Sequence, residues 1–180
     1  MTTGEITLYI ATSVDGFIAA EDGSVAWLEE FQSTGEADGG EGSYEAFFAD
    51  IEALVMGATT YEQVRSFGEW PYEDRPTYVL TRSNYPRATD AVEFVEGEID
   101  GLATRLERRH DRIWLVGGAQ VVRGFLREGH VDELRLSLVP VLLGRGISLF
   151  GESDQRRELE LLENTTHETG IVELRYEIGG

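Results

Sequence analysis

The sequence contains no cysteine. This absence excludes disulfide bonds, thiolate nucleophiles and metal sites built on cysteine. Histidine is scarce as well, and its three occurrences are His110, His130 and His167. Their separation gives none of the short spacings that pairs of metal-binding histidines show. The pattern therefore predicts three surface histidines and no metal site.

Lysine is also absent, so all 15 basic residues are arginines, against 34 acidic residues. The resulting net charge of −19 repels nucleic acid and anionic lipid at long range, so neither is expected as a partner. The acids are spread between apolar positions, which is typical of a folded chain with a solvated acidic surface. This composition resembles that of cytosolic proteins of salt-loving archaea, where high ionic strength screens the self-repulsion. The presence of a carboxylate is therefore not enough to assign it a catalytic role.

Long apolar runs are lacking too. No segment is long enough to cross a bilayer, and the N-terminal MTTGEITLYI has neither a basic start nor a signal-like apolar core. We therefore expect a cytoplasmic protein. Its 180 residues, 41% of them hydrophobic, suit a single domain over residues 1–180.

The usual nucleotide-binding fingerprints are missing, because neither G-x-G-x-x-G after the first strand nor G-x-x-x-x-G-K-S/T occurs. What is present is an apolar strand, 113–116, that runs through Gly117 and Gly118 into a segment of helical spacing. The glycines let a ligand lie against the backbone, and the first N–H groups of the helix attract an anion. A tight connection without a ligand explains the glycine pair equally well.

Two further predicted strands, 53–56 and 77–81, end in small or anion-binding residues. Those residues are Gly57, Thr59, Thr60, Thr81, Arg82 and Ser83. Either threonine after the glycine can cap the helix that follows. The first 64 residues contain no basic residue, so Arg82, Arg123 and Arg145 are the candidates to meet phosphate charge. Ligands of open α/β sheets bind where strands end, so these ends predict a phosphorylated cofactor.

The rest of the pattern predicts an α/β fold. Strands are expected at 5–12, 92–95, 131–139, 158–163 and 171–178, and helices at 43–51 and 99–110. Residues 35–42 contain almost no apolar side chain and predict a mobile loop. Strands that alternate with helices and then follow one another predict a mixed sheet covered on both faces, with an antiparallel hairpin at its end.

Several segments, in this order, resemble the dihydrofolate reductase superfamily. They are residues 10–19, 55–62, 79–83 and 116–119, then 131–134 with Pro140, Leu143, Gly144 and Gly146. More narrowly, they resemble the branch built like the C-terminal reductase domain of bacterial riboflavin biosynthesis deaminase-reductases. The resemblance implies a three-layer sandwich, in which helices cover both faces of a mixed, mostly parallel sheet that carries a C-terminal antiparallel hairpin.

The resemblance also implies NADPH as the cofactor. The residues implied near the nicotinamide are Ala11, Ile18 and Ala19. Those implied at the pyrophosphate are Gly57, Thr59, Thr60, Gly117, Gly118, Ala119 and Gln120, and Val116 is implied to bind the cofactor beside them. Thr81, Arg82 and Ser83 are implied at the adenosine 2′-phosphate. The chain departs from the family at Ala58, where an arginine is frequent, so one phosphate contact is missing.

The implied activity is hydride transfer to a small heterocyclic or ribosylamino-pyrimidine substrate, as in riboflavin biosynthesis. Asp15, Trp27 and Ser137 are the residues implied at the substrate, with Trp27 arriving on a loop. Each has a plain alternative: Asp15 forms a turn, Trp27 packs in the core, and the Ser137 hydroxyl bonds to the backbone. A homodimer through an edge strand or through 134–143 is compatible with this branch.

Two other functions stay open. Folate reductases carry a buried carboxylate on the helix after the tryptophan, but Gln32 falls at about that spacing here, and Glu29 and Glu30 read as solvated acids. A dihydrofolate or other pteridine reductase is the alternative on the same fold. A nucleotide-binding protein without turnover is the alternative of another class, left open by Ala58 and the missing carboxylate.

Overall fold

The computed structural model describes residues 3–32 and 43–179. The strands are β1 Glu5–Ser13, β2 Phe17–Ala19, β3 Ala53–Gly57, β4 Thr77–Leu80, β5 Val92–Val95, β6 Arg112–Gly117, β7 Glu133–Val139, β8 Ile147–Ser148, β9 Leu159–Thr166 and β10 Val172–Ile178. The helices are α1 Ala26–Gln32, α2 Ser43–Asp50, α3 Ala58–Ser66, α4 Ile99–Arg109 and α5 Ala119–Arg127. The loop expected at 35–42 lies outside the described residues.

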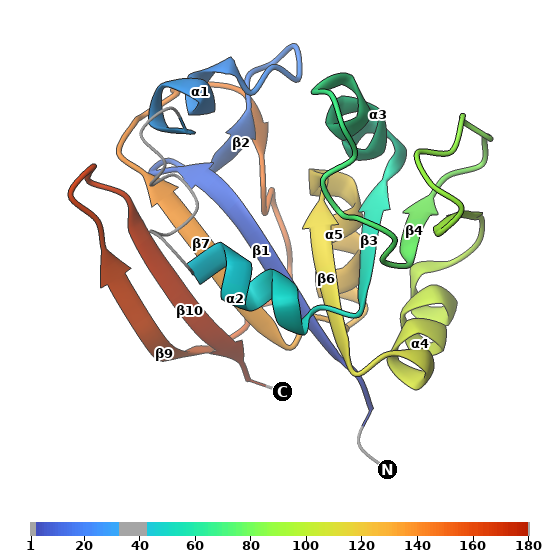
Figure 1. The fold of residues 1–180 in the computed structure, drawn as a ribbon. Helices are drawn as coiled ribbons and strands as arrows, with labels where there is room; N and C mark the ends of the chain where they lie inside the picture. The colour runs from blue at the N-terminus through green and yellow to red at the C-terminus, as the bar shows by residue number, and fades with distance from the viewer. Residues whose placement is uncertain (1–2, 33–42, 180) are drawn as a thin grey trace.

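One mixed sheet forms the centre of the fold (Figure 1). Its strand order is β5-β4-β3-β6-β1-β7-β10-β9. The pairs from β5 to β7 are parallel, and β10 pairs antiparallel with both β7 and β9. The carboxyl ends of six parallel strands therefore meet at one edge of the sheet. The predicted mostly parallel sheet with a C-terminal hairpin is confirmed.

Each face of the sheet has its own core. Helices α4 and α5 bury apolar side chains such as Leu106 and Phe125 against one face, together with Leu8 of β1. On the other face, α2 and α3 pack an aromatic cluster around Trp114 and Tyr61. Fully burying a large apolar side chain stabilises the fold by about 1.5–3 kcal/mol. Alternation along the strands thus fixes which side chains meet which helices.

The hairpin strand β9 departs from this arrangement. All eight of its residues are exposed, including Leu159, Leu161 and Leu162. Helices therefore cover the two faces of the parallel part of the sheet and leave the hairpin strand β9 exposed. An exposed edge strand with apolar side chains is suited to pairing with another chain. We propose β9 as the place where the expected homodimer forms.

One local prediction is wrong, and one small sheet was not predicted. Trp27 lies on helix α1 and not on a loop. Residues 17–19 and 147–148 form a small two-stranded sheet, β2 with β8, which the sequence pattern did not predict. No helix within the described residues is long and apolar enough to cross a membrane.

Candidate dinucleotide site and substrate pocket

The two strand–glycine–helix turns lie side by side at the carboxyl edge of the sheet. Strands β3 and β6 are neighbours, and Met56 pairs with Gly117. A Cβ at Gly57 would lie 3.0 Å from Val121, and one at Gly118 would lie 3.2 Å from the Thr60 hydroxyl. Glycine therefore lets the two turns approach each other closely.

Each turn opens a helix with free N–H groups at its start. Gly57 is the N-cap of α3 and Gly118 the N-cap of α5, and no side chain in the described part of the chain caps either helix. Free N–H groups and the helix dipole favour an anion at both starts. The prediction that Thr59 or Thr60 caps α3 is wrong, because both lie inside its first turn.

The third strand end adjoins the first. Leu80 at the end of β4 pairs with Gly57, so Thr81 follows beside the start of α3. The Ser83 N–H donates to the Thr81 hydroxyl at 3.1 Å, which closes the turn. Arg82 is exposed there. The three predicted strand ends thus form one row across β4, β3 and β6.

The residues expected near a nicotinamide continue this row onto β1. A Cβ at Gly117 would lie 3.6 Å from Ile10 of β1, and Ala11 is the next residue. Ala19 is buried, and the Gly146 backbone approaches it so closely that a Cβ there would lie 2.2 Å from the Ala19 carbonyl oxygen. Ile18 precedes Ala19 on β2. Val116, Ala119 and Gln120 flank the glycine pair on β6 and α5.

Asp15 fastens two loops together. Its carboxylate accepts hydrogen bonds from the Ser13 hydroxyl at 2.5 Å and from the N–H groups of Gly144 at 2.8 Å and Leu143 at 3.2 Å. The Ser13 hydrogen bond is the main cause that lowers the pKa of Asp15; burial opposes it, and the two N–H groups add to it. Asp15 is therefore an ionised anchor for the glycine-flanked loop before β8.

Arg123 and Arg145, the other two arginines expected to contact phosphate, differ in whether their side chains are already engaged. Arg123 donates from Nε to the Leu149 carbonyl at 3.2 Å and also contacts the Ser148 carbonyl. Its donors therefore hold the β8 segment against α5. Arg145 is exposed in the loop that Asp15 anchors.

Trp27 and Ser137 each carry a buried polar atom. Ser137 is 1% exposed and lies on the same face of the sheet as Tyr9. Within the described residues, neither Trp27 Nε1 nor Ser137 Oγ has a hydrogen-bond partner. The alternative of a backbone-bonded Ser137 hydroxyl is therefore wrong. Unpaired buried polar atoms are rare because desolvation costs free energy, so they point to a ligand or a bound water.

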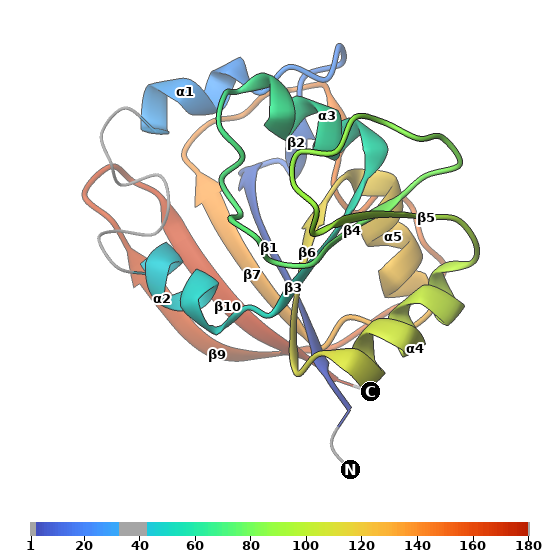
Figure 2. The same ribbon diagram turned by 45° about the vertical axis from the view of Figure 1, so that its right-hand side comes forward.

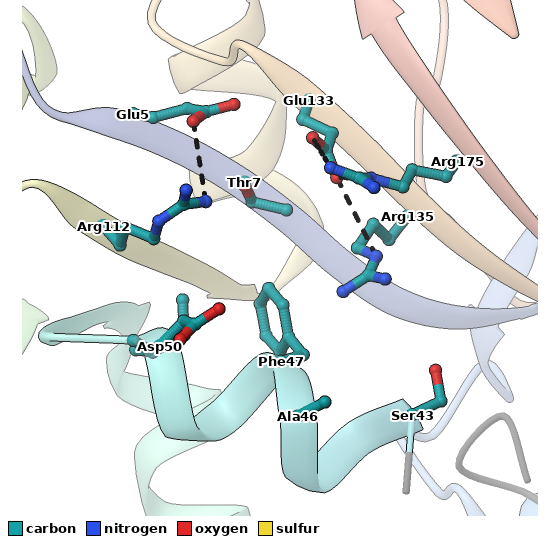
Figure 3. A pocket seen from close by; sticks show the side chains of 11 residues that line it. Glu5, Thr7, Ser43, Ala46, Phe47, Asp50, Arg112, Glu133, Arg135 and Arg175 are labelled. Atoms are coloured by element: carbon teal, nitrogen blue, oxygen red, sulfur yellow. Dashed lines mark hydrogen bonds and ion pairs between the residues drawn. The ribbon is translucent and has the colours of Figure 1, made fainter. Parts of the chain in front are cut away.

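A separate cavity of about 240 Å³ lies between α2 and the amino ends of the strands (Figure 3). Its charged lining consists of Glu5, Asp50, Arg112, Glu133, Arg135 and Arg175. Arg175 donates two hydrogen bonds to Glu133, at 2.6 and 3.0 Å. The Arg135 guanidinium lies over the rings of Tyr9 and Phe47, at 5.4 and 5.1 Å from their centroids. Sequence reasoning missed this surface, although polar residues alternate with leucines along β7 and signal a polar face.

The histidines are not simple surface residues, so that prediction is wrong. His130 Nε2 lies 2.7 Å from Asp100, and His110 contacts a tyrosine hydroxyl at 3.0 Å. The His167 side chain is 10% exposed and lies 3.7 Å from Glu173. Among residues 3–32 and 43–179, no group of histidine and acidic side chains is arranged to hold a metal.

Residues 5–173 match the family of the RibD C-terminal domain. The chain belongs to the RibD C-terminal domain family. Within the curated proteins, the uncharacterized YwjB of Bacillus subtilis is 37% identical over 171 residues, which cover 94% of this chain and 95% of YwjB. The riboflavin biosynthesis protein RibD of Corynebacterium ammoniagenes is 31% identical over 162 residues, or 80% of this chain and 45% of that protein. The family domain thus spans less than half of that RibD.

Solved structures share the fold of this RibD C-terminal domain. A protein from Shewanella sp. PV-4, named for riboflavin biosynthesis, superposes with a TM-score of 0.84 and 25% identity over all of both chains. Dihydrofolate reductase from Enterococcus faecalis, solved with NADP(H), gives a TM-score of 0.63 and 19% identity over 98% of this chain and 96% of that one. The second likeness concerns the fold alone. The resemblance to the RibD branch is confirmed, and the likeness to dihydrofolate reductase is one of fold.

Proposed function

We propose that this RibD C-terminal domain is an NADPH-dependent reductase that transfers hydride to a small heterocyclic or ribosylamino-pyrimidine substrate. The observation that carries the proposal is the row of strand ends across β4, β3 and β6, with two uncapped helix starts and an exposed arginine. A dinucleotide phosphate carries its anionic groups at separated points, and this row offers an anion site for each.

The residues of the row fit NADPH. Gly57 and Gly118 carry no side chain, and a Cβ there would be in tight contact with Val121 or Thr60. A pyrophosphate can therefore approach the N–H groups of α3 and α5 directly. Arg82 pairs with the 2′-phosphate, and Ala11 with Ala19 borders the nicotinamide. Bound NADPH supplies the hydride. The protein positions the two reactants and excludes water between them.

The substrate lies between the end of β1 and helix α1, beside Trp27 and Ser137. The name of RibD of Corynebacterium ammoniagenes supports a substrate of riboflavin biosynthesis, for which the family resemblance implies a ribosylamino-pyrimidine. Dihydrofolate is the weaker candidate, since Glu29 and Glu30 of α1 are exposed and supply no buried carboxylate.

Cofactor and substrate are tested together. NADPH is titrated into the protein at molar KCl while its fluorescence is followed, and we expect a Kd in the range of about 1–100 µM. Its oxidation is then compared with 5-amino-6-(5-phosphoribosylamino)uracil and with dihydrofolate as substrates. We expect turnover with the first compound. Absence of NADPH binding would contradict the reductase proposal.

The remaining outcomes separate the alternatives. Turnover of dihydrofolate alone would identify a folate reductase. NADPH binding without oxidation in the presence of either compound would identify a nucleotide-binding protein that has kept the fold without the reaction.

A further inference from the structure

Buried polar atoms without a partner gather at one place in the fold. Within the described residues there are four: Nε1 of Trp27 and of Trp70, Oγ of Ser137 and Nε2 of His167. Three of them belong to segments that lie at the carboxyl end of β7. Ser137 lies on β7, the turn with His167 joins β9 to β10 beside it, and α1, which carries Trp27, lies above the ends of β1 and β7 in both views (Figures 1 and 2).

A buried carboxylate lies among these atoms. Glu173 of β10 is 8% exposed. It pairs with Ser137 across the antiparallel ladder, and Ser137 in turn pairs with Ala11 of β1. Directly opposed residues project to the same face with their Cβ atoms about 4.5–5.5 Å apart. Ala11, Ser137 and Glu173 therefore form one row that leads from the expected nicotinamide position toward the hairpin.

The Glu173 carboxylate is fixed in place but not saturated. Its Oε1 accepts a hydrogen bond from the Tyr9 hydroxyl at 2.8 Å. Its Oε2 lies 3.7 Å from His167 Nε2, which is too long for a hydrogen bond. An ionised carboxylate has about four acceptor positions, so most of its capacity is free. Oε2 is not among the buried atoms that lack a partner, and Glu173 lines a small pocket, so this oxygen is accessible to a donor from a ligand.

The charges around Glu173 do not supply that donor. A small cavity that reaches Glu173 is also lined by Arg135, Arg175 and Glu163. Arg175 is engaged by Glu133 at 2.6 Å, and no hydrogen bond or ion pair joins either arginine to Glu173 in the described part of the chain.

We propose that Glu173 and Ser137 together bind the polar edge of the substrate ring. The carboxylate accepts hydrogen bonds from N–H groups of an amino- or imide-bearing heterocycle, and the hydroxyl completes the contact. The hydrogen bond from the Tyr9 hydroxyl holds the carboxylate in position. The inference rests on the proposed reductase function. It places the carboxylate that binds the substrate on β10, because the acids of helix α1 are exposed.

Diaminouracil, the ring of the proposed substrate, is the probe for this site. Its binding to the full chain is measured by calorimetry for the wild type, Glu173→Gln and Glu177→Gln. Glu177 is the matched control, because it lies on the same strand and is exposed. We expect Glu173→Gln to weaken binding by about tenfold or more, since a hydrogen bond to a charged group is lost. Glu177→Gln should change it less than about twofold, as surface changes usually do.

The result decides the inference independently of the cofactor. Equal binding by the wild type and Glu173→Gln, or no binding of diaminouracil by the wild type, would overturn it. If Glu173→Gln does not fold, Ser137→Ala takes its place, because it removes only an unpaired hydroxyl. Unchanged binding of diaminouracil by Ser137→Ala would also overturn the inference. NADPH titrations of the same variants should give the wild-type Kd. Absence of NADPH binding by the wild type would contradict the proposed function. The diaminouracil measurement would still test the role of Glu173 and Ser137.

Discussion

Arg82 is the cation whose task follows most directly from its place in the sheet. It is exposed just beyond β4, next to the strand that ends at Gly57. We expect Arg82→Ala to weaken NADPH binding by roughly 10- to 100-fold, because charge-assisted hydrogen bonds contribute about 1.5–3 kcal/mol. NADH lacks the 2′-phosphate, so its Kd should stay nearly constant. Fluorescence titration with both nucleotides measures the two effects.

Arg108 provides the matched control for Arg82. It is exposed at the far end of α4, so Arg108→Ala removes the same charge without touching the row of strand ends. Long-range attraction by net charge would make both variants lose NADPH affinity alike. Equal losses of NADPH and NADH in Arg82→Ala would show that Arg82 does not contact the 2′-phosphate.

Single residues differ in how far the sequence could place them. The glycines at 57 and 117–118 were predictable, because each interrupts an apolar strand just before a helical pattern. Glu173 was not. Its sequence neighbours resemble those of any strand acid, and its burial arises only because β10 lies next to β7, in register with Ser137.

At the scale of elements, His130 ties the turn after α5 to helix α4. Burial by itself lowers the pKa of His130, but its hydrogen bonds to Asp100 and Glu107 outweigh burial and raise it. A folded-state pKa above the unfolded value of about 6.5 means that the contact stabilises fully below that pH. The contribution is then lost as the pH rises through the folded-state pKa. The stabilisation that His130 provides between these two elements should therefore decrease at alkaline pH.

We expect His130→Gln to lower the free energy of unfolding by on the order of 1 kcal/mol at about pH 5.5 and by much less at about pH 9. Urea unfolding at constant ionic strength measures it. His110→Gln is the control of opposite sign, because burial, aided by Arg109 and opposed by Glu52, lowers the pKa of His110. The free energy of unfolding of His110→Gln should therefore rise relative to that of the wild type at acidic pH. A His130→Gln effect that does not change with pH would contradict the assignment.

Elements were predictable where packing follows the local pattern. The strand at 92–95 was predicted with its observed bounds, and the predicted helix beginning near Ile99 is α4. Helix α1 was missed, because its seven residues give too short a window for the helical period. A signal was present, since Ser24 accepts a hydrogen bond from the Ala26 N–H at 3.2 Å at the start of that helix.

At the scale of the whole molecule, charge governs stability. The chain carries a net charge of −19, and its acids repel one another wherever they lie within a Debye length, which is about 10 Å at 0.1 M salt and 3 Å at 1 M. The folded state brings these acids closer than the unfolded chain does. Screening should therefore favour folding, beyond any effect on a single ion pair.

We expect Tm to rise by roughly 5–15 °C between about 0.1 and 2 M KCl. If residues 1–180 form the single domain expected from the length, the protein should unfold in one transition. Calorimetry measures both the shift and the number of transitions. A variant with Glu69→Gln, Asp74→Asn and Glu152→Gln, all at exposed positions, should melt higher than the wild type in low salt and respond less to KCl. If repulsion is not the cause, the variant and the wild type will show parallel salt curves. Two separate transitions would contradict the single domain, and a flat curve for the wild type would mean that the acidic surface does not limit the stability of the fold.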